Sequence, residues 1–267
     1  MKQTILSSLS AECPWRDTLH WFDTVDSTND RLKELAANGA PHGTVLIAGQ
    51  QTKGRGRMGH SFYSPGEKGI YLSVLLRPGC SPEQLMHLTC AAAVAACDAI
   101  EAACGYRPGI KWINDLVANN KKVGGILTEL SVDSKTGTVT SAIIGIGINC
   151  THNREDFPPD LQGIAASLES VTGKSVRPDL LAAHLITALQ KMDSALFTEK
   201  KRTMNRYRQN CVTLGREITV LCADSLRCGS AMDIDENGGL VVHFQNGCIE
   251  TVSSGEVSVR GLQDYSW

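Results

Sequence analysis

The sequence lacks any cysteine pattern typical of a metal site or a redox pair. Ten cysteines are present among 267 residues, but they are scattered, with no Cys-x-x-C and no zinc-type Cys/His spacing. Cys90, Cys97 and Cys104 are seven residues apart, which predicts that they share one face of a helix. We therefore expect small buried hydrophobic side chains in a reducing cytosol, and no metal-ligating residues.

An excess of basic residues is also missing. Lys and Arg number 26 against 28 Asp and Glu, which gives a formal net charge of −2. Because nucleic-acid binding usually needs a basic surface, we expect no nucleic-acid partner. No signal peptide is evident in Met1 to Ser10, and the longest apolar run, residues 88–97, soon meets Asp98 and Glu101. These absences predict a cytoplasmic protein that does not cross a membrane.

What is present predicts an α+β protein with a small second domain. The apolar content of 42% allows a substantial core. Helices are expected at 29–38, 81–104 and, as the last one, 178–197, and strands at 44–49, 70–76, 109–113, 123–131 and 139–149. Hairpin links between strands predict a mixed or antiparallel sheet with helices on one face.

The character of the sequence changes near residue 211. Short strands are expected at 217–222, 229–234, 240–245, 249–252 and 257–260, with Asn-Gly turns between some of them. About 50 residues of short strands predict a small β-barrel. The predicted domains are therefore 1–211 and 212–267.

The most informative segment is a glycine- and arginine-rich loop, Gly54-Arg55-Gly56-Arg57-Met58-Gly59. Guanidinium groups and backbone N–H groups in such a loop suit a phosphate chain. The glycines match G-x-G-x-x-G, but no helix opens after them, and an apolar strand lies where a ribose-binding acid is needed. No Gly-Lys-Ser/Thr follows, which excludes a Walker loop. We interpret the loop as a local site for a small anionic ligand.

Four other stretches combine polar groups with strand ends or glycines: Asp26–Asn29, Lys111–Leu116, Lys121–Glu129 and Gly145–Asn149. Each has an ordinary structural interpretation. The first can be a helix cap, the second a solvated strand end, and the glycine-rich strands can contain simple bulges. A ligand site is the alternative for each: the first two stretches present polar groups to it, and strand glycines in the other two let a ligand approach the backbone closely. For Lys111–Leu116 alone, the solvated strand end is the favoured interpretation.

Together and in order, these stretches resemble the catalytic domain of the biotin–protein ligase family. That family has a Ser-Thr-Asn helix start, a Gly-Arg-Gly-Arg loop, Lys-Trp-Pro-Asn-Asp, Lys-x-x-Gly-Gly-Ile-Leu, Gly-x-Gly-Ile-Asn, and a Phe-Pro segment leading to Ala-Thr-Ser-Leu. The matching segments here are Ser27–Asn29, Gln50 with Gly54–Arg57, Lys111–Asp115, Lys121 or Lys122 to Leu127, Gly145–Asn149, and Phe157-Pro158 with Ala165–Leu168. The last strands resemble the family's SH3-like C-terminal domain. The likeness covers the chain from about residue 20.

The departures from the family pattern are few. Ile113 stands for a proline, Phe62 for a common tryptophan, His60 for a common arginine and Ala166 for a threonine. None touches the lysine or the two arginines, so the resemblance implies an active enzyme. The roughly 20 residues before the match are too short for the helix-turn-helix domain of some members, so we expect a short form without a repressor role.

The resemblance implies a two-step ligase. Biotin and MgATP give biotinyl-5′-AMP, and a lysine of a biotin carboxyl carrier protein or domain then accepts the biotin. Lys111, Arg55 and Arg57 would carry out the reaction. The implied biotin site is Ser27, Thr28, Asn29, Gln50, Gly54, Arg55, Gly56, Arg57, Lys111, Gly124, Gly125 and Gly147. The implied adenylate site is Arg55, Arg57, Lys111, Asn114, Asp115 and Asn149.

Other hypotheses stay open at this point. A lipoate–protein ligase shares the fold and the adenylate chemistry, and an RNA-binding module could use the two arginines. The sequence also leaves open whether the protein forms a homodimer.

Overall fold

The computed structural model describes residues 1–222 and 225–259, so Arg260, the end of the strand expected at 257–260, lies outside the described part. A seven-stranded sheet with the order β1-β2-β3-β7-β6-β5-β4 dominates the chain. Its strands are β1 Leu19–Val25, β2 Thr44–Gln51, β3 Gly69–Leu76, β4 Gly109–Lys111, β5 Asp115–Ala118, β6 Lys121–Val132 and β7 Val139–Asn149. β1 and β2 run parallel, and the other neighbouring strands run antiparallel.

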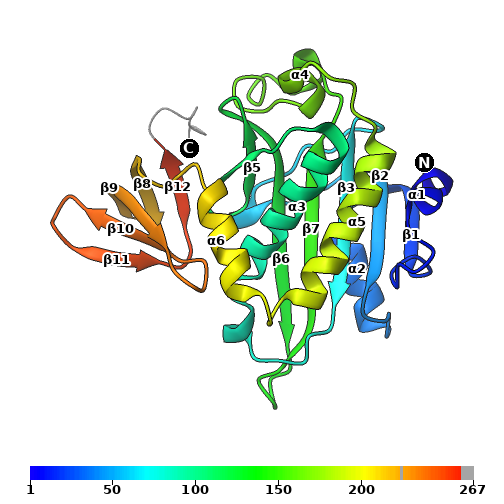
Figure 1. Cartoon of the computed structure of the whole chain (residues 1–267), viewed down its shortest axis with the longest axis horizontal. Helices are drawn as coiled ribbons and strands as arrows, with labels where there is room; N and C mark the ends of the chain where they lie inside the picture. Colours follow the sequence, from blue (N-terminus) through cyan, green and yellow to red (C-terminus); the bar gives the residue numbers. More distant parts are fainter. Residues whose placement is uncertain (223–224, 260–267) are drawn as a thin grey trace.

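Helices cover the two faces of this sheet unequally (Figure 1). α3 Leu88–Cys104 and α5 Pro178–Ala195 pack on one face, flanked by α6 Lys200–Asn210 and α1 Lys2–Ser8. α2 Thr28–Ala37 packs on the opposite face, where Leu32 joins a separate apolar cluster with Leu46, Leu75 and Ile143. The predicted α+β fold with a mixed sheet is confirmed, and α2 is an addition to the one helical face that was expected.

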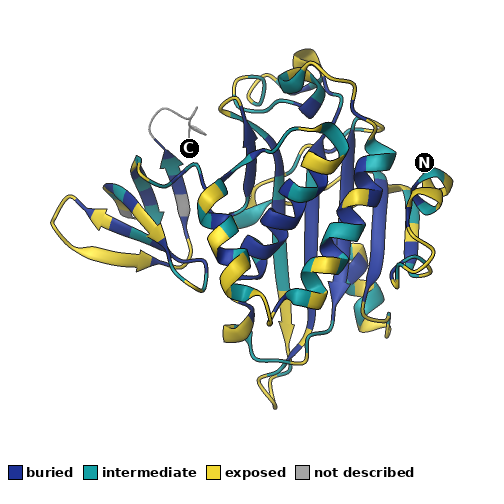
Figure 2. Ribbon diagram, in the orientation of Figure 1, coloured by how far each residue is buried: buried dark blue, intermediate teal, exposed yellow. Residues whose placement is uncertain are grey.

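α3 is the central helix of the core. Its side chains are mostly small, and alanine and cysteine let α5 and the sheet approach it closely. Cys90 and Cys97 are buried there, as expected, but Cys228 and Cys248 are exposed, so the expectation of buried cysteines is wrong for those two. By length and composition Pro82–Cys104 could cross a membrane, yet 72% of its most apolar window is buried in the fold, as in a core helix of a globular protein (Figure 2).

Several elements differ from the sequence-based expectations. The helix expected at 81–104 is two pieces, because a 3₁₀ turn at Pro82–Leu85 precedes α3. The helix at 178–197 is not the last one, because α6 follows it. α6 is strongly polar and buries only Met204 and Tyr207, so the sequence shows no helical repeat of apolar residues there. β1, α1 and the short α4 Leu168–Thr172 were also not expected.

A second, antiparallel sheet follows, with the order β11-β10-β9-β8-β12. Its strands are β8 Glu217–Cys222, β9 Ser225–Ile234, β10 Leu240–Phe244, β11 Ile249–Val252 and β12 Glu256–Val259. The indole N–H of Trp112 donates to the carbonyl of Gly238 at 2.8 Å, and the Trp112 backbone N–H donates to Thr213 Oγ1 at 2.9 Å. The small sheet is thus fastened to the residue that follows Lys111.

Candidate active site

The register of the large sheet places four predicted site residues side by side. Lys111 pairs with Asp115, Asp115 with Gly125, and Gly125 with Gly147. Directly paired residues on neighbouring strands point to the same side of a sheet. The two charged side chains therefore stand beside a part of the sheet that has no side chains, which leaves room for a ligand above the two glycines.

A cavity of about 450 Å³ lies over this row. Its wall contains most of the residues that the sequence pointed to: Ser27, Thr28, Asn29, Arg55, Gly56, Arg57, Lys111, Asn114, Asp115, Gly125, Gly147 and Asn149. The start of α2, the glycine-arginine loop, the β4–β5 turn and the glycine-rich strands thus meet at one place on the face of the sheet that carries α2.

Three predicted residues do not line the cavity. Gln50 is exposed, and its neighbour Gln51 lies in the wall instead. The ladder between β2 and β3 ends at Ala48, so sequence alone could not fix which of the two adjacent glutamines faces inwards. Gly124 and Gly125 are consecutive in a strand, so only Gly125 faces the cavity. Gly54 is buried behind the wall, where a Cβ would lie 2.3 Å from the Phe62 carbonyl oxygen.

One end of the cavity is a buried, hydrogen-bonded polar wall. The backbone N–H and the hydroxyl of Thr28 both donate to Gln51 Oε1, at 2.8 and 3.0 Å. Ser73 Oγ lies 2.8 Å from Thr28 Oγ1 and 2.6 Å from Asn29 Oδ1. Ser27, which caps α2, is also buried. Because buried polar groups held this way are pre-oriented, this end suits recognition of a small neutral polar group.

The opposite end is cationic. Lys111 is only 6% exposed, and Lys122 Nζ lies 2.7 Å from Asp115 Oδ1. Arg57 Nη1 donates to Asn114 Oδ1 at 3.3 Å, which ties the loop to the β4–β5 turn. Positive groups gathered in a partly buried cavity attract and stabilise an anion more strongly than they would in open water.

The glycine-arginine loop itself is a closed turn. The backbone N–H of Gly56 donates to the His60 carbonyl at 2.7 Å, and the Phe62 N–H donates to the Gly54 carbonyl at 2.9 Å. Met58 at its tip has a φ of 53° and is 68% exposed. Nothing apolar therefore anchors the tip, so the loop depends on polar contacts to stay over the cavity.

Sequence reasoning missed part of the wall. Lys122 and Phe62 were noted in the sequence but were not assigned to the site, and Gln51 was not considered. Tyr63 and the buried Phe157 add aromatic rings to the wall. The small sheet contributes Gly255, Val257 and Ser258. No local motif signals that contribution, because it depends on how the two sheets meet. Ile113, at the family's proline position, follows a cis peptide bond.

Gly147→Ala tests the glycine floor. A Cβ there would lie 2.4 Å from the Phe62 ring, so the ring and the loop carrying it would have to move out. We expect the KM for the small polar ligand of this cavity to rise by about fivefold, equivalent to ~1 kcal/mol, with little change in melting temperature. Gly137→Ala, in a distant turn with open space at its Cβ, is the control for a general glycine effect. An unchanged KM in Gly147→Ala would contradict the floor role.

A buried histidine supports the aromatic rim. His152 is 1% exposed and stacks on Phe157, with ring centroids 4.9 Å apart and planes 20° apart. Within the described residues, neither ring nitrogen has a hydrogen-bond partner. Burial lowers the pKa of His152 to about 4, with a smaller opposing effect from Asp156 and a lowering one from Lys68. The neutral ring is therefore the form that packs under the rim.

This arrangement predicts acid sensitivity. The unfolded chain binds a proton at His152 near pH 6.5 and the folded chain near pH 4, so stability falls as pH drops from 6.5 towards 4. The loss should reach roughly 3 kcal/mol below pH 4. His152→Phe should remove most of this component from urea unfolding measured between pH 7 and 4, and the same change at exposed His184 should not. Equal pH profiles for His152→Phe and the wild type would contradict the assignment.

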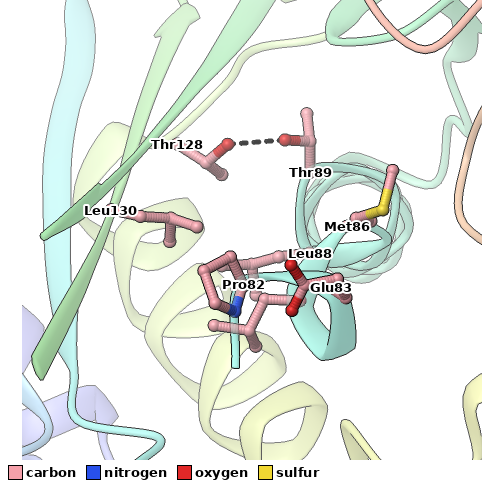
Figure 3. A pocket seen from close by; sticks show the side chains of 8 residues that line it. Pro82, Glu83, Met86, Leu88, Thr89, Thr128 and Leu130 are labelled. Atoms are coloured by element: carbon pink, nitrogen blue, oxygen red, sulfur yellow. Dashed lines mark hydrogen bonds between the residues drawn. The ribbon is translucent and has the colours of Figure 1, made fainter. Parts of the chain in front are cut away.

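A second cavity, of about 340 Å³, lies on the other face of the sheet. Pro82, Leu85, Met86, Leu88 and Leu130 make it largely apolar, and the hydroxyls of Thr89 and Thr128 meet at 2.6 Å beside it (Figure 3). Glu83, the one ionisable side chain among the described residues that line it, is exposed. This groove therefore offers no group for the chemistry considered above.

The large mixed sheet, its glycine-floored cavity and the appended small sheet define a ligase domain of the biotin and lipoate ligase class. Residues 21–149 match the model of the biotin/lipoate A/B protein ligase family, and residues 213–260 match the biotin protein ligase C-terminal domain. This chain belongs to the biotin protein ligase family.

Individual relatives agree with that assignment. The bifunctional ligase/repressor BirA of Bacillus spizizenii is 35% identical over 90% of this chain and 74% of its own length. The biotin–[acetyl-CoA-carboxylase] ligase of Mycobacterium tuberculosis is 32% identical over 93% of this chain and 91% of its own. The solved structure of the Aquifex aeolicus biotin protein ligase, in complex with biotin and ATP, superposes with a TM-score of 0.76 at 30% identity, covering 91% of this chain and 98% of that one.

Proposed function

We propose that this protein is an ATP-dependent biotin–protein ligase that forms biotinyl-5′-AMP and transfers biotin to a lysine of a carrier protein. The observation that carries the proposal is the row of Lys111, Asp115, Gly125 and Gly147 beneath the glycine-arginine loop, in a chain of this family. It joins a polar pocket, a bare floor and a cationic end within one cavity.

The residues divide the first step between them. Thr28, Asn29 and Gln51 hold the neutral polar ring of biotin, and Gly147 lets the ring lie flat on the sheet. The carboxylate then meets the α-phosphate at the cationic end. Two like unit charges about 4 Å apart repel by ~4 kcal/mol at an effective dielectric of 20. Lys111 and Arg57 offset that repulsion and stabilise the charge that builds up as pyrophosphate leaves.

The proposed reaction would receive its metal ion, Mg²⁺, bound to ATP. Among the described residues there is no group of three or more His, Cys, Asp or Glu that could hold a metal ion. Mg²⁺ commonly binds through substrate phosphates with few protein ligands, and it would neutralise part of the triphosphate charge. The exposed aromatic ring of Tyr63 beside the cavity offers a face on which adenine can stack.

In the second step the amine of the carrier lysine attacks the acyl carbon of the mixed anhydride. An amide bond forms, the bond to the phosphate oxygen breaks, and AMP leaves with its electron pair while the amine loses a proton. The loop keeps water from the anhydride until the carrier arrives. The proposed partner is the carrier domain of a biotin-dependent carboxylase, met in the cytoplasm, with no role for nucleic acid.

The test is pyrophosphate release with biotin, with lipoate or with neither, followed by mass measurement of a biotin carrier domain. We expect release only with biotin, and a mass gain of one biotinyl group on one lysine. Release driven by lipoate would replace the proposal with a lipoate ligase. Release without either acid, or none at all, would reject acyl-adenylate chemistry.

A further inference from the structure

The two arginines of the loop have different partners. Arg57 contacts the neutral side-chain amide of Asn114. Arg55 instead forms ion pairs with two carboxylates: its Nη1 binds Asp30 in α2, and its Nη2 lies 3.1 Å from Glu129 Oε1 in β6. The second contact reaches across the sheet face to a residue that follows the glycines of the Lys121–Glu129 motif, whose acidic end the proposed reaction leaves unused.

These contacts belong to a charge-balanced cluster of two acids and two bases. Lys33 Nζ lies 2.6 Å from Glu129 Oε1 and 3.3 Å from Asp30 Oδ1. The other carboxylate oxygen of Glu129 accepts a hydrogen bond from Asn29 Nδ2 at 2.8 Å. Glu129 therefore connects the loop, through Arg55, with the polar wall of the biotin pocket, through Asn29. Its side chain is 20% exposed, which makes it the most enclosed member of the ion pairs.

The balance of charge decides what Arg55 can do. A guanidinium inside this charge-balanced cluster presents little net positive potential to an approaching triphosphate. A guanidinium that contacts an amide keeps its full charge for an anion. The surroundings of the two side chains therefore favour Arg57, and not Arg55, as the phosphate-facing arginine.

We propose that Asp30 and Glu129 form a latch that positions the loop through Arg55. Of the two loop arginines, Arg57 is then the one that faces the phosphates. The inference rests on the proposed function and revises the sequence-based expectation that both arginines act on phosphate. Arg55 is then a positioning residue. The ion pairs are partly exposed, so each adds little to folding stability. Their effect should appear in how long the loop stays closed over the adenylate.

The experiment compares Arg55→Gln, Glu129→Gln and the double variant. Three quantities are measured: the KM for ATP, initial pyrophosphate release at saturating ATP, and escape of biotinyl-AMP as biotinylation of serum albumin. In both single variants escape should rise about fivefold, and the double variant should show no further rise, because both changes open the same latch. In Glu129→Gln the KM for ATP and the release rate should stay within about twofold of wild type, and Arg55→Gln should change them no more than Glu129→Gln does.

Two controls sharpen the result. Glu34→Gln removes an acid from the same helix as Asp30, but Glu34 pairs with Arg31 outside the cluster, so this variant should behave as wild type. Arg55→Lys keeps a cation that can reach the carboxylates, so it should restore part of the retention. Melting temperatures identify any variant that is simply unfolded, and tryptic cleavage after Arg57 should be faster in Glu129→Gln than in Glu34→Gln.

Other results would overturn the latch. If Arg55→Gln raises the KM for ATP about tenfold while Glu129→Gln does not, Arg55 binds phosphate directly. Additive escape in the double variant, or single variants that leak no more than Glu34→Gln, would mean that the cluster does not hold the loop. A wild-type protein without biotin-dependent pyrophosphate release would instead refute the proposed function itself, so the two failures are distinguishable.

Discussion

Replacing Lys111 with alanine is expected to lower biotin-dependent pyrophosphate release by about 10²- to 10³-fold, the usual cost of losing one well-placed group that stabilises transition-state charge. The lysine is 6% exposed and shares a sheet row with Asp115 beside the glycine floor. Its charge acts where the carboxylate and the phosphate meet, so the loss should fall mainly on kcat rather than on the KM for biotin.

The fold should tolerate this change. The strand that carries Lys111 is held by its neighbours, because Trp112 bonds to Thr213 and Gly238. The melting temperature of Lys111→Ala should therefore stay close to that of the wild type. Lys135→Ala, at an exposed turn, is the matched control. Near-wild-type release from a folded Lys111→Ala protein would remove the lysine from the mechanism.

Lys111→Arg separates charge from geometry. Arginine keeps the positive charge, but its planar fork is longer and bulkier than an ammonium group, and Lys111 sits in an enclosed position. We expect this variant to recover little of the lost rate. Full recovery would indicate that only the local potential matters, and not the placement of a single donor.

The site could be predicted from the sequence where the function depends on short-range patterns. A glycine pair in a strand, a lysine before an amide and an acid, and a capped helix start each signal their own geometry. Sheet pairing then joins them: the hairpin turn at Asn119-Asn120 is legible in the sequence, but a register shift between Leu116 and Val117 decides that Asp115 pairs with Gly125 and not with Gly124.

The rest could not be predicted because it depends on tertiary context. Whether Gln50 or Gln51 faces the cavity is decided where β2 leaves its ladder with β3. The contribution of Ser258 needs the docking of the small sheet. The partners of Arg55, Asp30 in α2 and Glu129 in β6, are distant in sequence from the loop. The composition of the loop therefore predicted phosphate binding by Arg55, whereas its ion pairs in the fold favour a latch.

Arg57→Gly is expected to release biotinyl-AMP from the closed site, with about tenfold more biotinylation of serum albumin than the wild type gives. The substitution removes the contact to Asn114, which ties the loop to the β4–β5 turn, and it adds a fourth glycine to the stretch from 54 to 59. A residue without a side chain has more open conformations to populate, so the loop closes less of the time.

Two variants separate the lost cation from the gained flexibility. Met58 already has a φ of 53°, which glycine adopts without strain, so Met58→Gly adds flexibility at the adjacent position and leaves Arg57 in place. Arg57→Ala removes the cation without adding a glycine. If the contact with Asn114 holds the loop, Arg57→Ala should release nearly as much biotinyl-AMP as Arg57→Gly, and Met58→Gly much less.

Adenylation should also slow in both Arg57 variants, since the phosphates lose a partner. Albumin labelling no higher than wild type in Arg57→Gly, with pyrophosphate release intact, would mean that closure of the loop does not retain the adenylate.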